Sequence, residues 1–290
     1  MAVRVEPWNE AVRELVESEF GPAKHWTVEQ GRGGWQPPSD GEFWSRCLIL
    51  FDTTAPVAVA SAFHPRLHPA REWLYVEVAP AQRLKGWGTE AVKALRAAVP
   101  DHAGPLRAKV LADSPAAAMA ASQQMTPIQR TREVHIQVPA DLIVTGTVRD
   151  LDPADPGAIA AWRTWYIEGH HWDPPAPQPD QFWTEMSTDT EHVIAVADES
   201  GIVGIGHTYT DNGVQWFVGG ALHRDPEIAA TLLVAAQRRQ PGIPIRVELD
   251  DWMTDVSAVI DTLDHTVIEE AFIVADHPAT TSAASTITAV

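Results

Sequence analysis

The chain of 290 residues is long enough for one large domain or two ordinary ones, each able to bury its own core. Its 21 Lys and Arg residues against 39 Asp and Glu residues give a net charge of −18, which argues against nucleic acid or an anionic membrane surface as a partner. The single cysteine, Cys47, excludes an intramolecular disulfide and a thiolate-rich metal site, and its apolar neighbours predict a core residue rather than a nucleophile.

The first residues contain no predicted targeting segment, because Arg4, Glu6 and Glu10 interrupt any apolar run. No later stretch has the length and apolarity needed to cross a bilayer. We therefore expect a cytoplasmic protein. The acidic balance also suits a cationic substrate such as a polyamine or an amino sugar, although the charges are scattered along the chain.

Hydrophobic periodicity predicts alternating strands and helices in the first half. Strands are expected at residues 3–5, 47–51, 57–63, 74–78, 106–111 and 132–138, and helices at residues 10–20, 90–99 and 115–123. A connection rich in Gly, Pro and Trp, residues 21–41, separates the first helix from the second strand.

The second half repeats this order of elements. Strands are expected at residues 144–148, 192–197, 202–209, 214–218 and 245–247, and helices at residues 156–169 and 228–237. Residues 214–218 fall on residues 74–78 at an offset of 140. We therefore predict two copies of one domain joined near Ala140, with ranges 1–140 and 141–278 and a tail at 279–290.

Residues 74–89 combine a strand, a basic glycine-bearing turn and the start of a helix. Gly86 and Gly88 allow a tight turn and a close approach to a ligand, and the first turn of a helix presents free N–H groups. Arg83 and Lys85 add positive charge. The stretch predicts a site for a phosphate or pyrophosphate, the alternative being an ordinary strand-to-helix turn without a ligand.

Together, Val78, Pro80, Arg83, Gly86 and Gly88 resemble the acyl-CoA-binding motif of the GNAT superfamily of N-acetyltransferases, R/Q-x-x-G-x-G/A after a V-x-P strand end. The resemblance implies an α/β fold of two tandem GNAT-like domains, each a mixed, mostly antiparallel sheet flanked by helices. It implies acetyl-CoA as acyl donor, with the pyrophosphate on the loop amides and the thioester carbonyl on the main-chain N–H of Val78. The cofactor-binding residues are then Val76, Val78, Arg83, Leu84, Lys85, Gly86, Trp87, Gly88 and Thr89.

The second copy differs at this loop, where it reads His223, Arg224, Asp225 and Pro226. Asp225 followed by Pro226 predicts a helix start whose N–H groups are capped by a carboxylate, and neither glycine is present. We expect this degenerate copy not to bind CoA at its own loop. Structural support and a contribution to the substrate pocket are its expected roles.

Glu72 and Glu77 are the candidate general bases for deprotonating an amine. Strand alternation places Glu72 on the face of Val76 and Val78 and Glu77 on the other. GNAT members carry a glutamate near the position of Glu72, which slightly favours that residue. For each glutamate, a solvated or ion-paired strand residue is the alternative.

The tyrosine acid of the GNAT pattern N-x-x-A-x-x-x-Y has no counterpart after the fifth strand, where Ser114, Ala117 and Ala121 stand. The proton donor is then Ser122, a water or a residue from the other half, or the thiolate leaves unassisted.

Four residues in the two long connections are candidates for substrate binding: Trp35, His171, Trp172 and Asp173. Tryptophan faces can hold a cationic amine, and Asp173 can supply counter-charge. Alternatively, the rings cap the two cores and the histidines are solvated. No metal site is expected, because Pro65 and Pro69 prevent a helix that would bring His64 and His68 together.

The sequence and the resemblance together predict an acetyl-CoA-dependent N-acetyltransferase that acts on a primary amine of a small molecule by direct transfer in a ternary complex. Neither nucleic acid nor a membrane is expected as a partner. Two alternatives remain: a silent protein that binds acyl-CoA or a small ligand, and an enzyme that uses another acyl-CoA, since the pyrophosphate loop does not read the acyl group.

Overall fold

The computed structural model describes residues 3–23, 25–139, 142, 144–186, 190–211 and 213–276, without the side chain of Trp26. The described residues form two compact units. Unit 1 holds the residues up to Pro65, Ala70–Ile128 and the residues from Ile273, and unit 2 holds Arg66–Pro69 and Gln129–Phe272. The predicted boundary near residue 140 would instead place Arg66–Pro69 and residues 129–139 in the first domain and the residues from Ile273 in the second. Both Ala140 and the predicted tail at 279–290 lie outside the described residues.

Unit 1 contains a mixed sheet with strand order β1-β2-β3-β4-β5. Its strands are β1 (Val3–Pro7), β2 (Ser45–Asp52), β3 (Ala55–Phe63), β4 (Glu72–Val78) and β5 (Leu106–Leu111). Its helices are α1 (Arg13–Phe20), α2 (Trp26–Gly33), α3 (Trp87–Ala98) and α4 (Pro115–Ser122), with 3-10 turns η1 (Glu10–Val12) and η2 (Pro80–Gln82). Only β4 and β5 run parallel among these paired strands. The end of β12 (His265–Ala275) lies beside β5, where Asp276 N donates to Leu106 O at 2.9 Å.

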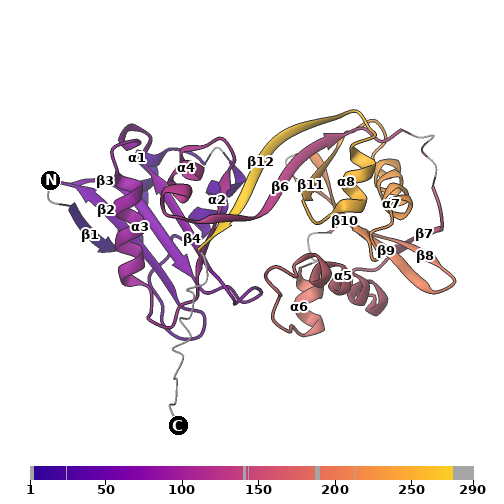
Figure 1. Cartoon of the computed structure of the whole chain (residues 1–290), viewed down its shortest axis with the longest axis horizontal. Helices are drawn as coiled ribbons and strands as arrows, with labels where there is room; N and C mark the ends of the chain where they lie inside the picture. Colours follow the sequence, from indigo (N-terminus) through magenta and orange to yellow (C-terminus); the bar gives the residue numbers. More distant parts are fainter. Residues whose placement is uncertain are drawn as a thin grey trace, which may run out of the picture. The chain divides into compact units, whose positions relative to one another are not determined.

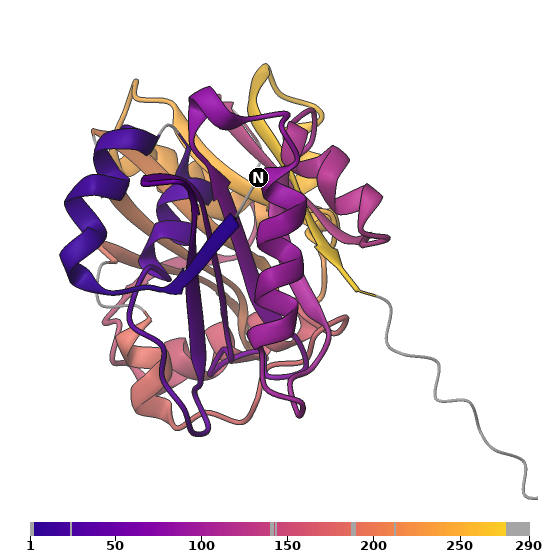
Figure 2. The same ribbon diagram turned by 90° about the vertical axis from the view of Figure 1, so that its left-hand side faces the viewer.

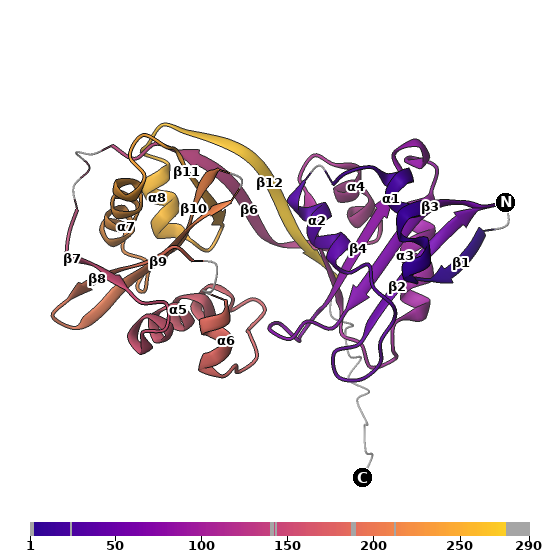
Figure 3. The ribbon, with the colours of Figure 1, turned by 180° about the vertical axis from the view of Figure 1, so that it is seen from behind.

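Helices cover both faces of this sheet. Helix α3 lies in front of β2 and β3 in Figure 1, whereas α1 and α2 lie in front of the same sheet when it is seen from behind in Figure 3. Figure 2 shows the sheet edge-on between the two layers. The strands β2 and β3 read as nearly continuous apolar runs because helices bury both of their faces. Amphipathic α3 turns Ala91, Val92 and Leu95 towards the sheet.

Unit 2 has the strand order β12-β6-β11-β10-β9-β8-β7. Its strands are β6 (Thr126–Ile136), β7 (Thr147–Leu151), β8 (His192–Asp198), β9 (Gly201–Asp211), β10 (Val214–Ala221) and β11 (Ile245–Asp250). Its helices are α5 (Pro156–Gly169), α6 (Asp180–Glu185), α7 (Pro226–Arg239) and α8 (Thr254–Ile260). Strands β10 and β11 run parallel, as β4 and β5 do in unit 1.

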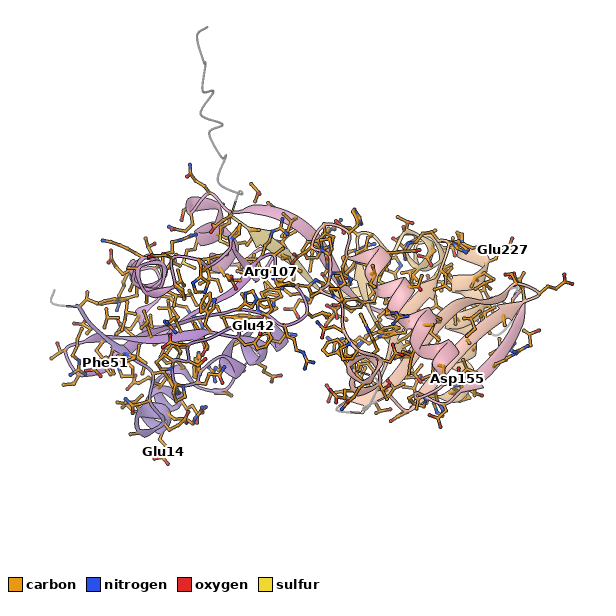
Figure 4. All side chains as sticks on the ribbon, turned by 90° about the horizontal axis from the view of Figure 1, so that it is seen from below. Glu14, Glu42, Phe51, Arg107, Asp155 and Glu227 are labelled. Atoms are coloured by element: carbon orange, nitrogen blue, oxygen red, sulfur yellow. The ribbon has the colours of Figure 1, made fainter. Side chains whose placement is uncertain are left out.

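Side chains fill the space between sheet and helices in each unit (Figure 4). Helix α7 is buried from Ala229 to Gln237 and forms the centre of the unit 2 core. Asp155, at the start of α5, accepts from the N–H groups of Gly157 and Ala158, as expected for an N-cap aspartate before proline. In the described part of the chain, every helix is too short or too polar to cross a membrane.

The predicted α/β class is confirmed, with a mixed, mostly antiparallel sheet flanked by helices in each half. The sequence patterns missed α2, α6, α8 and β12. Helix α2 lies within the Gly- and Trp-rich connection that looked irregular, and β6 spans Thr126–Ile136 instead of the expected 132–138. Short helices and edge strands carry weak periodicity, and their positions depend on tertiary packing.

The repeat is also present, but its offset of 140 is wrong for the strand before the loop. The strands β5 and β11 are related by an offset of 139, from Leu106 to Ile245. Their pairing partners, Glu72 on β4 and Gln215 on β10, are 143 residues apart. Helix α7 again begins 139 residues after α3. The connection from strand to helix is therefore four residues shorter in unit 2, and Ala221 is the counterpart of Val78.

Candidate active site

Strands β4 and β5 separate soon after they begin. They pair only at Glu72 with Leu106 and at Trp73 with Arg107. Glu72 N donates towards β5, to Pro105 O at 2.9 Å, whereas Ala79 N donates towards β3, to Val57 O at 3.0 Å. Because main-chain N–H groups alternate along a strand, those of Val76 and Val78 point to the β5 side, where the strands have diverged.

A cavity of about 610 Å³ occupies this opening and lies within unit 1. Its volume is in the range of small-molecule sites. Leu74, Val76 and Val78 line it from one face of β4, and Tyr75 and Glu77 line it from the other. The cavity therefore passes through the sheet, from the N-terminus of α3 on one side to α2 on the other.

The glycine-bearing loop forms the α3 end of the cavity. Leu84 and Gly86 adopt left-handed backbone conformations, with φ of 61° and 88°. Gly86 is the N-cap of α3 and has no side chain to bond the first N–H groups of the helix. These donors are available to an anion, as at other phosphate-binding helix N-termini.

Gly88 packs closely against Met119. A Cβ at this position would lie 2.7 Å from Met119 Sδ on α4. Any side chain at Gly88 would therefore displace Met119, which also lines the cavity.

Most of the predicted CoA residues come together around this cavity. They are Val76, Val78, Arg83, Leu84, Gly86, Trp87, Gly88 and Thr89. Lys85 is the exception: it does not line the cavity, and its Nζ donates to Gln82 Oε1 at 2.9 Å. Arg83 Nε donates to Val78 O at 3.3 Å, which holds its guanidinium next to the strand end.

Glu72 does not line the cavity. Its side chain is 2 % exposed, its Oε1 accepts from Gly104 N at 2.9 Å, and its Oε2 lies 3.0 Å from His64 Nδ1. These bonds tie the loop before β5 to the start of β4. The geometry favours a structural role for Glu72.

Glu77 does line the cavity, from the α2 side. Arg32 on α2 binds it with two hydrogen bonds, of 2.6 Å from Nη2 and 2.9 Å from Nε. The hydrogen bond to Glu77 raises the pKa of Arg32, so the guanidinium stays charged. The pair fixes α2 over the end of β4.

Tyr75 was missed by the sequence reasoning. It shares the α2 side of β4 with Glu77, and its ring stacks on Trp73 at 5.7 Å and on Phe63 at 6.2 Å. Burial raises the pKa of Tyr75 to about 12, so its hydroxyl keeps its proton at neutral pH. Strand alternation, which places Glu77 and Glu72 on opposite faces of β4, also places Tyr75 on the face of Glu77 and could have predicted its position.

The four predicted substrate residues fall in different places. Trp35 lines the cavity. His171, Trp172 and Asp173 belong to unit 2, where His171 is exposed and Asp173 is fully buried, its main-chain oxygen 2.6 Å from His68 Nδ1. Their role in substrate binding stays a prediction.

The remaining polar candidates serve local structure. Ser122 lines the cavity, but its hydroxyl donates to Met119 O at 2.6 Å. Ser114 caps α4 by accepting from Ala117 N at 3.2 Å. Burial raises the pKa of Cys47 to about 12, which disfavours a thiolate. Among the described residues, no three His, Cys, Asp or Glu side chains are grouped to hold a metal.

The counterpart of this site in unit 2 is occupied by the protein itself. Ala221 N donates to Asp255 Oδ2 at 2.7 Å, and Asp255 on α8 is 1 % exposed. A Cβ at Gly220 would lie 2.9 Å from both Asp255 Oδ2 and Trp165 Nε1. The start of α7 is capped as predicted, with Asp225 Oδ1 accepting from Glu227 N at 2.9 Å.

Solved structures share this fold at low sequence identity. A GCN5-related N-acetyltransferase (GNAT) from Sphaerobacter thermophilus aligns over 94 % of this chain and 95 % of its own, with a TM-score of 0.62 and 14 % identity. A tandem GNAT protein from the clavulanic acid biosynthesis pathway aligns over 95 % and 98 %, with a TM-score of 0.61 and 13 % identity. A GCN5-related N-acetyltransferase from Kribbella flavida aligns over 93 % and 71 %, with a TM-score of 0.54 and 13 % identity.

No protein-family profile matches the sequence, and no curated protein is similar to it at a significant level. The likeness is therefore one of fold. The chain has the GNAT fold, in the tandem form that the sequence resemblance predicted.

Proposed function

We propose that this protein is an acyl-CoA-dependent N-acyltransferase that transfers an acetyl group from acetyl-CoA, bound in unit 1, to a primary amine of a small molecule. One observation carries the proposal. The uncapped N-terminus of α3 and the diverging end of β4, with the N–H of Val78 aimed into the gap, line the same cavity. A pyrophosphate needs the first feature, and a thioester carbonyl needs the second.

Each end of the cavity has a distinct task in this proposal. The amides of the loop and of the first turn of α3 bind the pyrophosphate, with Arg83 beside them. The gap between β4 and β5 receives the pantetheine arm. The N–H of Val78 donates to the thioester oxygen as it becomes negative during attack.

The amine approaches from the α2 side, where Glu77 lies. Its nitrogen bonds to the thioester carbon while the carbon–sulfur bond breaks, which gives an amide and CoA. Glu77 accepts the proton that the nitrogen loses, directly or through water. The thiolate of CoA is a good leaving group and takes up a proton afterwards. Glu77 is preferred over Glu72 because it alone of the two lines the cavity.

A silent acyl-CoA-binding protein is the second candidate. It is favoured by the ion pair between Glu77 and Arg32, which engages the carboxylate that a base mechanism requires. The two functions differ in whether the thiol is released.

Titration calorimetry tests the proposal first. One acetyl-CoA should bind per chain, and Gly86→Asp should weaken binding by about 100-fold or more, because a carboxylate at the helix N-terminus replaces the anion. Gly213→Asp is the matched control, since Gly213 also has a positive φ, of 77°, and open space around it, but lies in unit 2. It should bind like the wild type.

Absence of acetyl-CoA binding by the wild type would contradict the proposal. Tight binding without thiol release across a broad panel of amines would favour the silent protein. Thiol release with at least one amine, lost in Gly86→Asp and kept in Gly213→Asp, would support the transferase.

A further inference from the structure

The α2 end of the cavity contains information on the acceptor, and the inference drawn from it rests on the proposed function. If acetyl-CoA fills the loop end and the gap in the sheet, the space under α2 is left for the amine. Thr27, Val28, Gly31, Trp35, Tyr75 and Glu77 line this part.

The charge of the cavity is unlike that of the chain as a whole. Although the chain carries a net charge of −18, Glu77 is the sole acidic side chain among the described residues that line the cavity. Arg83 and Lys109 also line it, and Arg32 already neutralises Glu77. A polyamine would bring several positive charges into a space with one paired carboxylate, which is unfavourable.

The walls of the α2 end are apolar and closely spaced. Trp35 is 3 % exposed and packs against the rings of Trp8, at 5.3 Å, and Phe20, at 5.7 Å, so it is a fixed wall. A Cβ at Gly31 would lie 3.0 Å from Tyr75 Cδ1. The absence of a side chain at Gly31 therefore lets α2 pack directly against the Tyr75 ring, which holds this ring as a second wall.

Polar groups are few among the residues that the structure describes at this end. There, the hydroxyls of Thr27 and Tyr75 and the carboxylate of Glu77 are partners that side chains supply to an acceptor, and His25 also lines the cavity. A sugar ring would bury several hydroxyls among these walls and leave most of them without partners, which is costly. One amine can still be accommodated, because each carboxylate oxygen of Glu77 accepts more than one hydrogen bond.

We infer that the acceptor is a small monoamine whose nitrogen is carried on a flat apolar body, with the amine directed at Glu77 and the body lying against the apolar wall that Val28, Trp35 and Tyr75 form. Polyamines and amino sugars, which the acidic composition suggested, are poor fits. An aromatic ring against this wall gains apolar burial and contacts with the aromatic side chains.

A thiol-release assay at saturating acetyl-CoA tests the inference with three probes. These are 2-phenylethylamine, with one amine and one apolar ring, spermidine, with several amines and no ring, and glucosamine, with one amine on a polar ring. We expect kcat/KM for 2-phenylethylamine to exceed the other two by about 10-fold or more, which corresponds to about 1.4 kcal/mol.

Three variants test whether 2-phenylethylamine binds at the α2 end of the cavity. Gly31→Ala places a methyl group against Tyr75 and should raise KM for 2-phenylethylamine about 10-fold, while the Kd of acetyl-CoA changes by less than about 2-fold. Gly33→Ala is the matched control, because Gly33 lies on the same helix with no atom near its Cβ position and does not line the cavity. It should leave KM unchanged. Tyr75→Ala should raise KM in the same way as Gly31→Ala.

The outcomes separate this inference from the proposed function. Spermidine or glucosamine as the better acceptor, or an unchanged KM in Gly31→Ala, would overturn the inference and leave the transferase intact. Failure of acetyl-CoA to bind, or binding without thiol release by any amine, would overturn the proposed function itself.

Discussion

The two units place the same strand, connection and helix around two different interiors. In unit 1 the N–H of Val78 points into a cavity that Ala116 also lines. In unit 2 the corresponding N–H, of Ala221, is bonded to the carboxylate of Asp255. Asp255 lies 139 residues after Ala116, the offset that also relates α3 to α7, so the position that lines the open site of unit 1 carries in unit 2 the carboxylate that binds this N–H.

The difference shows which features the fold needs and which it does not. Helix α7 forms without either glycine of the first loop and after a connection four residues shorter. The left-handed glycine at 86 and the uncapped start of α3 are thus dispensable for the architecture. Features that one copy keeps and the other replaces with a capped, self-bonded arrangement are best explained by a ligand.

The strongest test of this comparison transfers the unit 2 arrangement into unit 1. Ala116→Asp puts a carboxylate in the first turn of α4, where it can take the Val78 N–H as Asp255 takes that of Ala221. It would also repel the oxyanion. We expect kcat/KM for thiol release to fall by about 1000-fold, the scale associated with losing an oxyanion donor and adding repulsion.

Ala121→Asp is the matched control, since Ala121 is exposed on the same helix and does not line the cavity. It should retain wild-type kinetics, and circular dichroism should show both variants folded. Wild-type activity in Ala116→Asp would mean that the Val78 N–H is not the donor that the comparison identifies.

The sequence was sufficient to predict the position of the glycine-bearing loop but not which residues surround it in the cavity. Glycine spacing and the V-x-P strand end located Val78 and the start of α3, because these signals are local. The alternation of β4 correctly separated Glu72 from Glu77. The hydrogen bonds of Glu72 to Gly104 and of Glu77 to Arg32 join residues that are 32 and 45 positions apart, so no local pattern could decide which glutamate faces the cavity.

The shorter connection of unit 2 explains why the sequence comparison aligned β4 and β10 incorrectly. An offset of 140 aligns Val78 with Val218, whereas the strand register aligns it with Ala221. The register of two apolar strands cannot be determined from their sequences alone, because it depends on the strands with which they pair. The hydrogen bond between Ala221 and Asp255 therefore could not be predicted from the sequence, whereas the capping role of Asp225 was predicted correctly.

The two units should also differ in acid stability. His207 in unit 2 is 5 % exposed and stacks on Trp162 at 4.0 Å, and burial lowers its pKa to about 4. The unfolded chain takes up a proton near pH 6.5 that the folded unit resists, so stability falls as the pH drops below that value. The loss should be about 1 kcal/mol at pH 5.5 and should approach about 3 kcal/mol below pH 4.

Hydrogen exchange at pH 7.5 and pH 5.5 measures this difference. Protection of β8 and β9 in unit 2 should fall more than protection of β2 and β3 in unit 1. In His207→Gln, which cannot titrate in this range, the extra loss in unit 2 should vanish. An undiminished loss in that variant would show that another group is responsible.

The smallest expected effect concerns the capped helix of unit 2. Asp225→Ala removes the acceptor for Glu227 N and should lower the free energy of unfolding by about 1 kcal/mol, the usual contribution of an N-cap. Asp155→Ala, which uncaps α5 in the same unit, should cost a similar amount and serves as the matched control. Calorimetry should still give one acetyl-CoA per chain in both variants, because opening the α7 N-terminus leaves Asp255 on the Ala221 N–H and the connection four residues shorter. Two acetyl-CoA molecules per chain in Asp225→Ala alone would mean that the cap, rather than the filled interior, keeps the second copy empty.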